Sequence, residues 1–158
     1  MATWQDFEKE APELAPAVLA RLEAHRHHVL ATLRRDGSPR VSGTEVLLMG
    51  ADLTFGSMLD AVKVRDLRRD PRFALHANPG DGTMAGGDAK LAGRAVEIVD
   101  EVSRLAYESE LPQPPPGPYH AFRLDLTEVV LTSIGPGGDH LLIQSWRPGE
   151  EVHTVRRD

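Results

Sequence analysis

The chain has 158 residues, a net charge of −6, 41% hydrophobic and 27% charged residues, and no cysteine. This length and composition predict a single domain over residues 1–158 and argue against a disordered chain. Without cysteine there are no disulfides, Cys-ligated zinc sites, iron–sulfur clusters or thiol nucleophiles, so any redox chemistry requires a bound cofactor.

The distribution of apolar and charged residues also indicates the cellular location and the classes of partner to expect. No apolar run approaches the roughly 18–20 residues that a helix needs to span a bilayer. Residues 1–10 carry acidic side chains and lack the apolar stretch of a secretory signal. The net negative charge argues against a general nucleic-acid or anionic-membrane binder. We therefore expect a cytoplasmic protein with neither kind of partner.

The first 26 residues are expected to be helical. Apolar residues recur at helical spacing through this segment, and Thr3 with Asp6 resembles a capping pair. Proline breaks a helix interior, so Pro12 and Pro16 are expected to divide the segment into two short helices.

Period-two and apolar patterns then indicate strands. Asp36-Gly37 between two such runs is a strong hairpin signal, and Gly50 opens the next turn, so the first three strands should form a meander. About six or seven short strands with tight turns favour a mainly β fold, an antiparallel barrel with flanking helices, over a doubly wound parallel sheet. The strands are expected over residues 28–34, 40–49, 53–57, 72–77, 88–100, 119–134 and 140–146.

Helices and loops are expected between these strands. A basic amphipathic helix is predicted over Met58–Arg69, with Ser57 at its N-terminus, and a polar helix over Glu101–Glu110. The Gly- and Asp-rich segment Asn78–Gly87 is expected to be a loop. Pro112–Pro118 holds five prolines in seven residues, which predicts an exposed, extended loop rather than a domain boundary.

The start of the basic helix is a candidate anion site. A helix N-terminus offers unpaired N–H groups and the positive end of the helix dipole, and Gly56 lets a ligand approach the backbone. Ser57 adds a hydroxyl donor, and Lys63 can extend its ammonium toward the same anion. A phosphomonoester fits this combination. From spacing alone the alternative stays open that Ser57 is an ordinary N-cap and the basic residues form a solvated face.

Five pieces of sequence carry a family resemblance by their order and spacing. They resemble the pyridoxamine 5′-phosphate oxidase-like, FMN-binding split-barrel superfamily, which also includes deazaflavin (F420)-dependent reductases. The resemblance is clearest between residues 29 and 99. The five pieces are Leu30-Ala31-Thr32-Leu33, Asp36-Gly37-Ser38-Pro39, Arg40-Val41-Ser42-Gly43-Thr44, the run from Gly56-Ser57 through Lys63 to Asp70-Pro71, and Gly93-Arg94-Ala95.

The resemblance implies a set of cofactor-binding residues. In the family, a lysine eight residues before the proline that follows the helix contacts the cofactor phosphate, and Lys63 stands eight before Pro71. Trp146, at the end of a strand, is expected to cover a bound ring or a neighbouring subunit, or to pack in the core. The implied contacts are Gly56, Ser57 and Lys63 to the phosphate and ribityl chain, and Arg40, Ser42, Thr44 and Asp88 to the ring system.

The resemblance further implies a homodimer that binds FMN or F420 and transfers hydride to or from a small organic substrate. Val62 replaces the arginine that true pyridoxamine 5′-phosphate oxidases carry before the lysine, and Ser145–Gly149 differs from their C-terminal signature. We therefore do not expect a typical pyridoxamine 5′-phosphate oxidase. The alternative is a non-catalytic module that binds flavin, haem or another tetrapyrrole on the same barrel.

Three neighbouring histidines do not predict a metal site. His25, His27 and His28 lack the i, i+4 spacing of helical ligands, and no nearby carboxylate completes a ligand set. We expect a structural or solvated role for them and no bound metal.

Overall fold

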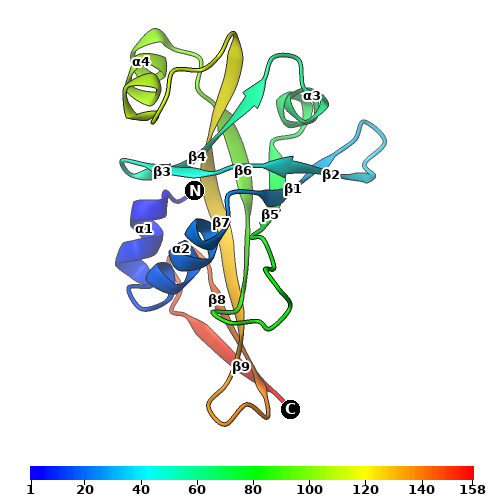
Figure 1. Ribbon diagram of the computed structural model, residues 1–158, viewed down its shortest axis with the longest axis vertical. Coiled ribbons are helices and arrows are strands. Elements are labelled where there is room, and N and C mark those ends of the chain that lie inside the picture. The colour runs from blue at the N-terminus through cyan, green and yellow to red at the C-terminus, as the bar shows by residue number, and fades with distance from the viewer.

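The computed structural model describes residues 1–158 as four helices and nine strands (Figure 1). The helices are α1 (Trp4–Glu10), α2 (Leu14–Ala24), α3 (Val62–Arg69) and α4 (Glu101–Glu110). The strands are β1 (His28–Leu33), β2 (Pro39–Thr44), β3 (Leu47–Met49), β4 (Asp52–Met58), β5 (Arg72–His76), β6 (Asp88–Glu97), β7 (Tyr119–Ile134), β8 (Leu141–Trp146) and β9 (His153–Arg157).

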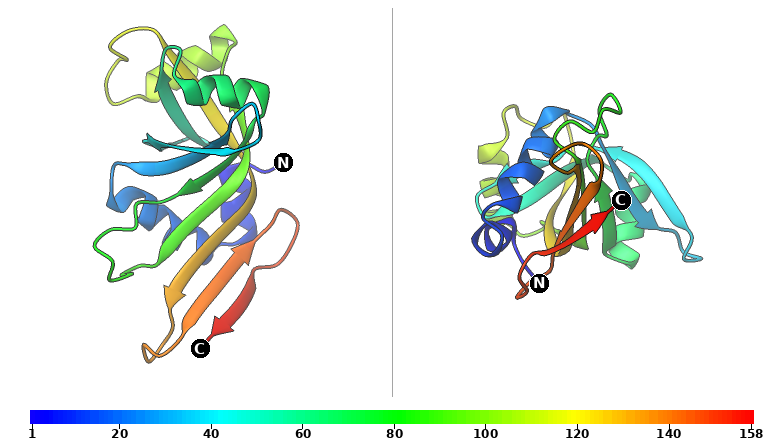
Figure 2. Two further views of the ribbon diagram at one scale, coloured as in Figure 1. Left: turned by 90° about the vertical axis from the view of Figure 1, so that its right-hand side faces the viewer. Right: turned by 90° about the horizontal axis from the view of Figure 1, so that it is seen from below.

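All pairings in the sheet are antiparallel, and the main path runs β2-β1-β5-β6-β7-β4-β3. The long strand β7 pairs with β6 along most of its length, with β4 over its first part and with β8 over its second. Strands β8 and β9 form a ribbon that extends away from α3 and α4 (Figure 2). This is the expected mainly β split-barrel fold with flanking helices.

The strand count and one connection differ from expectation. The predicted strand over residues 40–49 is two strands, β2 and β3, and the polar tail forms β9, so there are nine strands rather than six or seven. The Asp36-Gly37 hairpin is confirmed, and Gly50 makes the β3–β4 turn with a φ of +57°. The predicted meander is wrong, because β2 and β3 lie at opposite ends of the sheet path.

The core fills the barrel interior with alternate residues of the strands. Along β4, Leu53 and Phe55 point inward, and the Phe55 ring stacks on Phe122 of β7 with the centroids 5.0 Å apart. Leu30, Leu75 and other apolar side chains from neighbouring strands join them. The alternation that predicted the strands therefore also selects the buried face.

Helices α1 and α2 cover one side of the barrel. The Thr3 hydroxyl accepts the Asp6 N–H and the Asp6 carboxylate accepts the Thr3 N–H, which confirms the predicted cap of α1. The chain breaks at Pro12, whereas Pro16 lies in the first turn of α2, where proline is tolerated. The segment therefore forms two helices, as expected.

Helices α3 and α4 lie at the other end of the barrel, near the ends of β4 and β7 (Figure 1). The prediction that α3 begins after Ser57 is wrong, because β4 continues to Met58 and the helix begins at Val62. Helix α4 has the predicted bounds, and its N-cap Asp100 accepts the Ser103 N–H. The proline-rich segment after α4 is a loop, as expected.

None of the four helices combines the length and apolar character required to cross a membrane.

Candidate functional site

The barrel is open between β2 and β4, which approach each other without pairing. We call this opening the split and define it by the free edge of β2 at Val41 and Gly43 and the end of β4 at Gly56 and Ser57. It brings together the second-strand residues and the phosphate-site residues predicted from the sequence. The residues that border it decide what the site can bind.

The backbone of β2 faces the split at alternate residues. The Arg34 N–H donates to the Ser38 carbonyl at the hairpin turn, and hydrogen-bonded pairs then alternate along the strand. The backbone groups of Val41 and Gly43 consequently point away from β1, toward the split. Apart from the Gly43 carbonyl, which accepts the Lys63 ammonium, these N–H and carbonyl groups are available to a ligand that offers both donors and acceptors.

Lys63 spans the split from the first turn of α3. Its Nζ donates to the Gly43 carbonyl on β2 at 2.9 Å and lies 5.9 Å from the ring centroid of Phe55 on β4. Burial lowers the pKa of the Lys63 ammonium. An ammonium has three N–H donors, and only one of them has a protein acceptor here. The half-buried lysine therefore offers charge and donors to an anion in the split.

The N-terminus of α3 is uncapped. The residue before its first turn is Ala61, which has no side chain that can accept a hydrogen bond from the helix. The first N–H groups of α3, at Val62 and Lys63, have no carbonyl partner within the helix. The helix dipole places partial positive charge at the same point. These groups and the Lys63 ammonium together form an anion-binding arrangement.

Ser57 and Gly56 lie at the end of β4, on opposite faces of the strand. Ser57 is buried, and the only hydrogen bond of its hydroxyl is a long one, 3.4 Å, to the adjacent Met58 carbonyl. A Cβ on Gly56 would lie 2.9 Å from the Tyr107 hydroxyl of α4. The close approach of α4 therefore explains the glycine, and Ser57 is a strand residue rather than the N-cap of α3.

The predicted β2 residues Arg40, Ser42 and Thr44 share the inward face of the strand. Arg40 Nε donates to Asp66 of α3 at 2.7 Å, and the Thr44 hydroxyl donates to the Glu45 carbonyl. The Ser42 hydroxyl is buried without a hydrogen-bond partner. Ser42 is thus the one of these three side chains whose only polar atom is left for a ligand, while Arg40 is held through its Nε.

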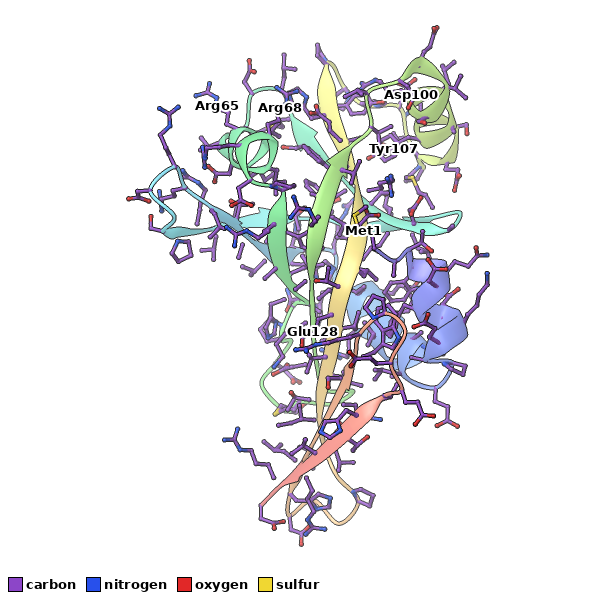
Figure 3. The ribbon with its side chains drawn as sticks, turned by 180° about the vertical axis from the view of Figure 1, so that it is seen from behind. Met1, Arg65, Arg68, Asp100, Tyr107 and Glu128 are labelled. Atoms are coloured by element: carbon purple, nitrogen blue, oxygen red, sulfur yellow. The ribbon has the colours of Figure 1, made fainter.

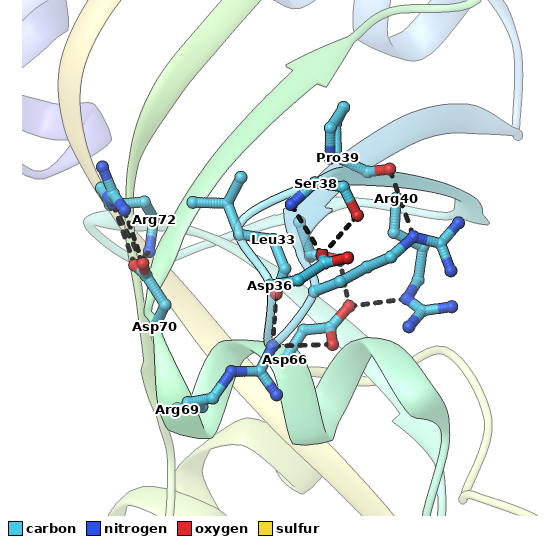
Figure 4. A network of polar contacts seen from close by, with 11 residues as sticks. Leu33, Asp36, Ser38, Pro39, Arg40, Asp66, Arg69, Asp70 and Arg72 are labelled. Atoms are coloured by element: carbon cyan, nitrogen blue, oxygen red, sulfur yellow. Dashed lines mark hydrogen bonds and ion pairs between the residues drawn. The ribbon is translucent and has the colours of Figure 1, made fainter.

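Asp66 joins α3 to the β1–β2 hairpin. Its buried carboxylate accepts hydrogen bonds from Thr32, Arg40 and Arg69, and we call these four residues the α3 network (Figure 4). Burial alone would raise the pKa of Asp66, but these hydrogen bonds outweigh it and hold the pKa below its usual value. The network fixes the helix that carries Lys63 against the strand that borders the split.

Two residues that were predicted to contact the cofactor lie away from the split. Asp88 begins β6, where it pairs with Thr132, and β1 and β5 separate that strand from β2. Trp146 is 0% exposed, lies 4.8 Å from the Phe7 ring, and donates its Nε1–H to Glu10. In this chain Trp146 therefore packs in the core and does not border the split, which is the core-packing alternative. Asp88 does not join the split of its own chain.

Two features beside the split were missed by sequence reasoning. Asp66 lies three residues after Lys63 on α3, so helical spacing could have suggested that both face the same strand. His120 pairs with Ser57 across β4 and β7, a relation that depends on strand register and has no local sequence signal.

Two grooves adjoin β4 on the α4 side. One, of about 410 Å³, is bordered by the end of β4, Tyr107 and the proline-rich loop. The other, of about 580 Å³, lies between α4 and the sheet and includes Asp100 and Arg123. Figure 3 shows Arg65 and Arg68 on α3 and Asp100 and Tyr107 on α4 on either side of the strands. The end of β4 is therefore accessible from both the split and the α4 side.

Comparisons with known proteins identify the same fold. A model of the pyridoxamine 5′-phosphate oxidase family matches residues 14–133. A pyridoxamine 5′-phosphate oxidase-related, FMN-binding protein from Nostoc punctiforme is 16% identical with a TM-score of 0.69, and the match covers 94% of this chain and 96% of that one. No curated protein matches the sequence.

Two further solved structures share the fold. PhzG from Burkholderia lata, in complex with tetrahydrophenazine-1-carboxylic acid, is 16% identical with a TM-score of 0.58, over 90% of this chain and 87% of that one. An F420 reductase is 20% identical with a TM-score of 0.50, over 65% of this chain and 87% of that one. Identities this low establish the fold alone.

Proposed function

Because the chain belongs to the pyridoxamine 5′-phosphate oxidase family, we propose that it is an oxidoreductase that binds FMN or F420 in the split. The cofactor, when bound, supplies hydride transfer to or from a small organic substrate. The observation that carries the proposal is the uncapped N-terminus of α3, which follows Ser57 and carries Lys63. The FMN-binding protein and the F420 reductase of the same fold support a cofactor of this class.

The residues around the split fit a cofactor phosphate. A phosphate dianion needs several donors and positive charge, which the N-terminus of α3, the Lys63 ammonium and the Ser57 hydroxyl provide. In our proposal Lys63 exchanges its hydrogen bond to the Gly43 carbonyl for the phosphate, or makes both. Its partial burial strengthens that charge–charge attraction.

The free edge of β2 fits the ring system. The pyrimidine part of a flavin or deazaflavin presents both hydrogen-bond donors and acceptors, and the backbone groups of Val41 and Gly43 present the complementary array. The unpartnered Ser42 hydroxyl lies on the same strand. We assign orientation of the ring to these groups, and Arg40 on the same strand is joined to Asp66 through its Nε.

We further propose a homodimer that covers the outer sheet face next to β2. An apolar groove of about 390 Å³ lies on this face, where Val29 is 43% and Val41 is 70% exposed. Such a patch beside an unpaired edge strand favours association. The wild-type chain should have a dimer mass by light scattering, and Val41→Asp should give a folded monomer. A monomeric wild-type chain would contradict this part of the proposal.

The proposed function is tested by titrating the purified protein with FMN, F420 and riboflavin. Lys63→Ala should weaken FMN binding by about 1–3 kcal/mol, because it removes a charged donor from a partly buried site. The control Lys9→Ala removes the same charge from α1, far from the split, and should bind like wild type. Failure to bind either phosphate-bearing cofactor would refute the proposal, and unchanged affinity in Lys63→Ala would refute the assigned anchor.

Turnover separates the enzyme from a non-catalytic binding module. The cofactor-loaded protein is reduced under anaerobic conditions and then exposed to candidate oxidised substrates while the cofactor absorbance is recorded. Reoxidation that depends on the substrate supports the oxidoreductase. Stable binding without reoxidation by any member of a broad substrate panel favours the module.

A further inference from the structure

The first part of the turn between β4 and α3 has little packing to fix its position. The turn covers residues 59–61 and connects Ser57 and Met58 of β4 to the helix that carries Lys63. Met58 is 81% and Leu59 is 50% exposed, and Asp60 has a left-handed φ of +60°. Asp and Asn adopt this conformation more readily than most residues, but it still costs conformational energy. Ala61 is the residue of the turn that packs against the core, so polar contacts must hold the part around Asp60 in place.

One of those contacts is made by a buried histidine. The Asp60 N–H donates to His120 Nε2 at 3.3 Å, and the Ala61 N–H donates to the Met58 carbonyl at 3.3 Å. His120 lies on β7 directly opposite Ser57 in the strand register and is 9% exposed. The same imidazole is thus next to the strand residue and the turn residue that flank the phosphate site.

The orientation of the imidazole is set from its other side. Since Nε2 accepts the Asp60 N–H, we assign the ring proton to Nδ1, which then donates to Glu97 of β6 at 3.2 Å. Nδ1 also lies 3.3 Å from Arg68 Nη2. Arg68 of α3 donates to both oxygens of Glu97, at 2.9 and 2.7 Å. A continuous polar chain therefore runs from α3 through β6 and β7 to the turn.

We propose that His120 is a positioning residue for the cofactor phosphate, which it serves by fixing the turn between Ser57 and Lys63. Through Nε2 it holds the turn, and through Glu97 and Arg68 it ties the turn to α3 itself. The donors of the uncapped helix N-terminus are thereby kept at a fixed distance from the Ser57 hydroxyl. This inference rests on the proposed function, because it concerns the same phosphate site.

A specific readout distinguishes positioning of the phosphate site from general support of the fold. FMN and riboflavin share the ring and the ribityl chain, and FMN alone has the phosphate. A residue that positions the phosphate donors changes the preference for FMN over riboflavin, whereas a merely structural residue changes stability and leaves this ratio unchanged. If the wild-type protein binds only F420, the phosphate-free chromophore of F420 takes the place of riboflavin.

The experiment compares dissociation constants for both ligands in wild type, His120→Leu and His120→Gln. His120→Leu should weaken FMN binding about tenfold, the equivalent of one lost hydrogen bond in a partly buried site, and riboflavin binding less than about twofold. Gln places an amide oxygen near the position of Nε2, so His120→Gln should restore FMN affinity to within about threefold of wild type. The control His153→Leu, on exposed β9, should leave both constants unchanged.

Each outcome bears on a different claim. A wild-type protein that binds no phosphate-bearing cofactor overturns the proposed function. A wild-type protein that binds FMN, with the FMN-to-riboflavin ratio retained in His120→Leu, overturns the role of His120 alone. If His120→Leu does not fold, Glu97→Gln serves instead, because it keeps the side-chain size but weakens the partner of Nδ1. That variant should bind FMN about threefold more weakly than wild type, and an unchanged ratio again overturns the inference.

Discussion

The α1–α2 layer and the α3 network both fasten helices to the barrel, but with different chemistry. By the α1–α2 layer we mean helices α1 and α2 with the Trp146 ring of β8 that packs against α1. In this layer Trp4, Phe7 and Trp146 are almost fully buried and meet edge-on or tilted. In the α3 network, the contacts are hydrogen bonds and ion pairs to the buried carboxylate of Asp66. The first arrangement contributes stability through buried area. The second fixes polar groups at the split in defined positions.

The comparison implies that damage to the two regions should have different consequences. Loss of an aromatic residue from the α1–α2 layer should lower stability without altering cofactor binding. Loss of a polar residue from the α3 network should affect both, because Lys63 lies on the same helix as Asp66. Two substitutions test this contrast, and a third tests a side chain beside the split.

Trp146→Ala should have the largest effect on stability. Removing a fully buried tryptophan leaves a large cavity against Phe7 and removes the Nε1–H hydrogen bond to Glu10, at a cost of about 3–5 kcal/mol. Urea denaturation measures the loss, and FMN titration of the folded protein should give the wild-type dissociation constant. If the folded variant bound FMN tenfold more weakly than wild type, Trp146 would contribute to the cofactor site after all.

Asp66→Asn should have the next largest effect, about 2–4 kcal/mol. The variant leaves Arg40 and Arg69 beside a neutral amide in a buried position. Cofactor affinity should also fall, since α3 is less firmly held. Asp158→Asn, at the exposed end of the chain, is the matched control and should change neither quantity. Equal affinity in Asp66→Asn and wild type would contradict the link between the network and the split.

The same substitution predicts a pH dependence. Because the pKa of Asp66 is lower in the folded than in the unfolded chain, its contribution is complete above the unfolded pKa, near 4. It is lost as the pH falls through the folded pKa. The free energy of unfolding should therefore decrease less between pH 7 and pH 3 in Asp66→Asn than in wild type. Parallel pH profiles would show that Asp66 is not held in its charged form.

Features set by neighbouring residues in the chain could be predicted from the sequence. The Thr3–Asp6 cap, the Asp36-Gly37 hairpin and the bounds of α4 each depend on residues a few positions apart. Apolar alternation predicted most strands for the same reason. The placement of β3 was not predictable in this way, because it pairs with β4 across the split from β2.

In the site, too, features set by nearby residues were predictable from the sequence, whereas features set by strand pairing were not. Ser57 and Lys63 were placed near one another by spacing and by family resemblance, and they do lie on either side of one short turn. Periodicity could not show that β4 extends through Ser57, because its pairing with His120 and Tyr119 of β7 continues to Met58. The resemblance assigned Asp88 to the ring system, but the strand order separates it from β2.

Ser42→Ala should have the smallest effect. It should raise the stability of the protein but weaken cofactor binding. The Ser42 hydroxyl is buried without a partner, so its removal relieves a desolvation cost and should stabilise the cofactor-free protein by about 1 kcal/mol. If the hydroxyl binds the cofactor ring, the same change should weaken FMN binding roughly threefold to tenfold. Ser109→Ala, on the exposed surface of α4, is the control. Higher stability with unchanged affinity would remove Ser42 from the site and leave the ring to the backbone of β2.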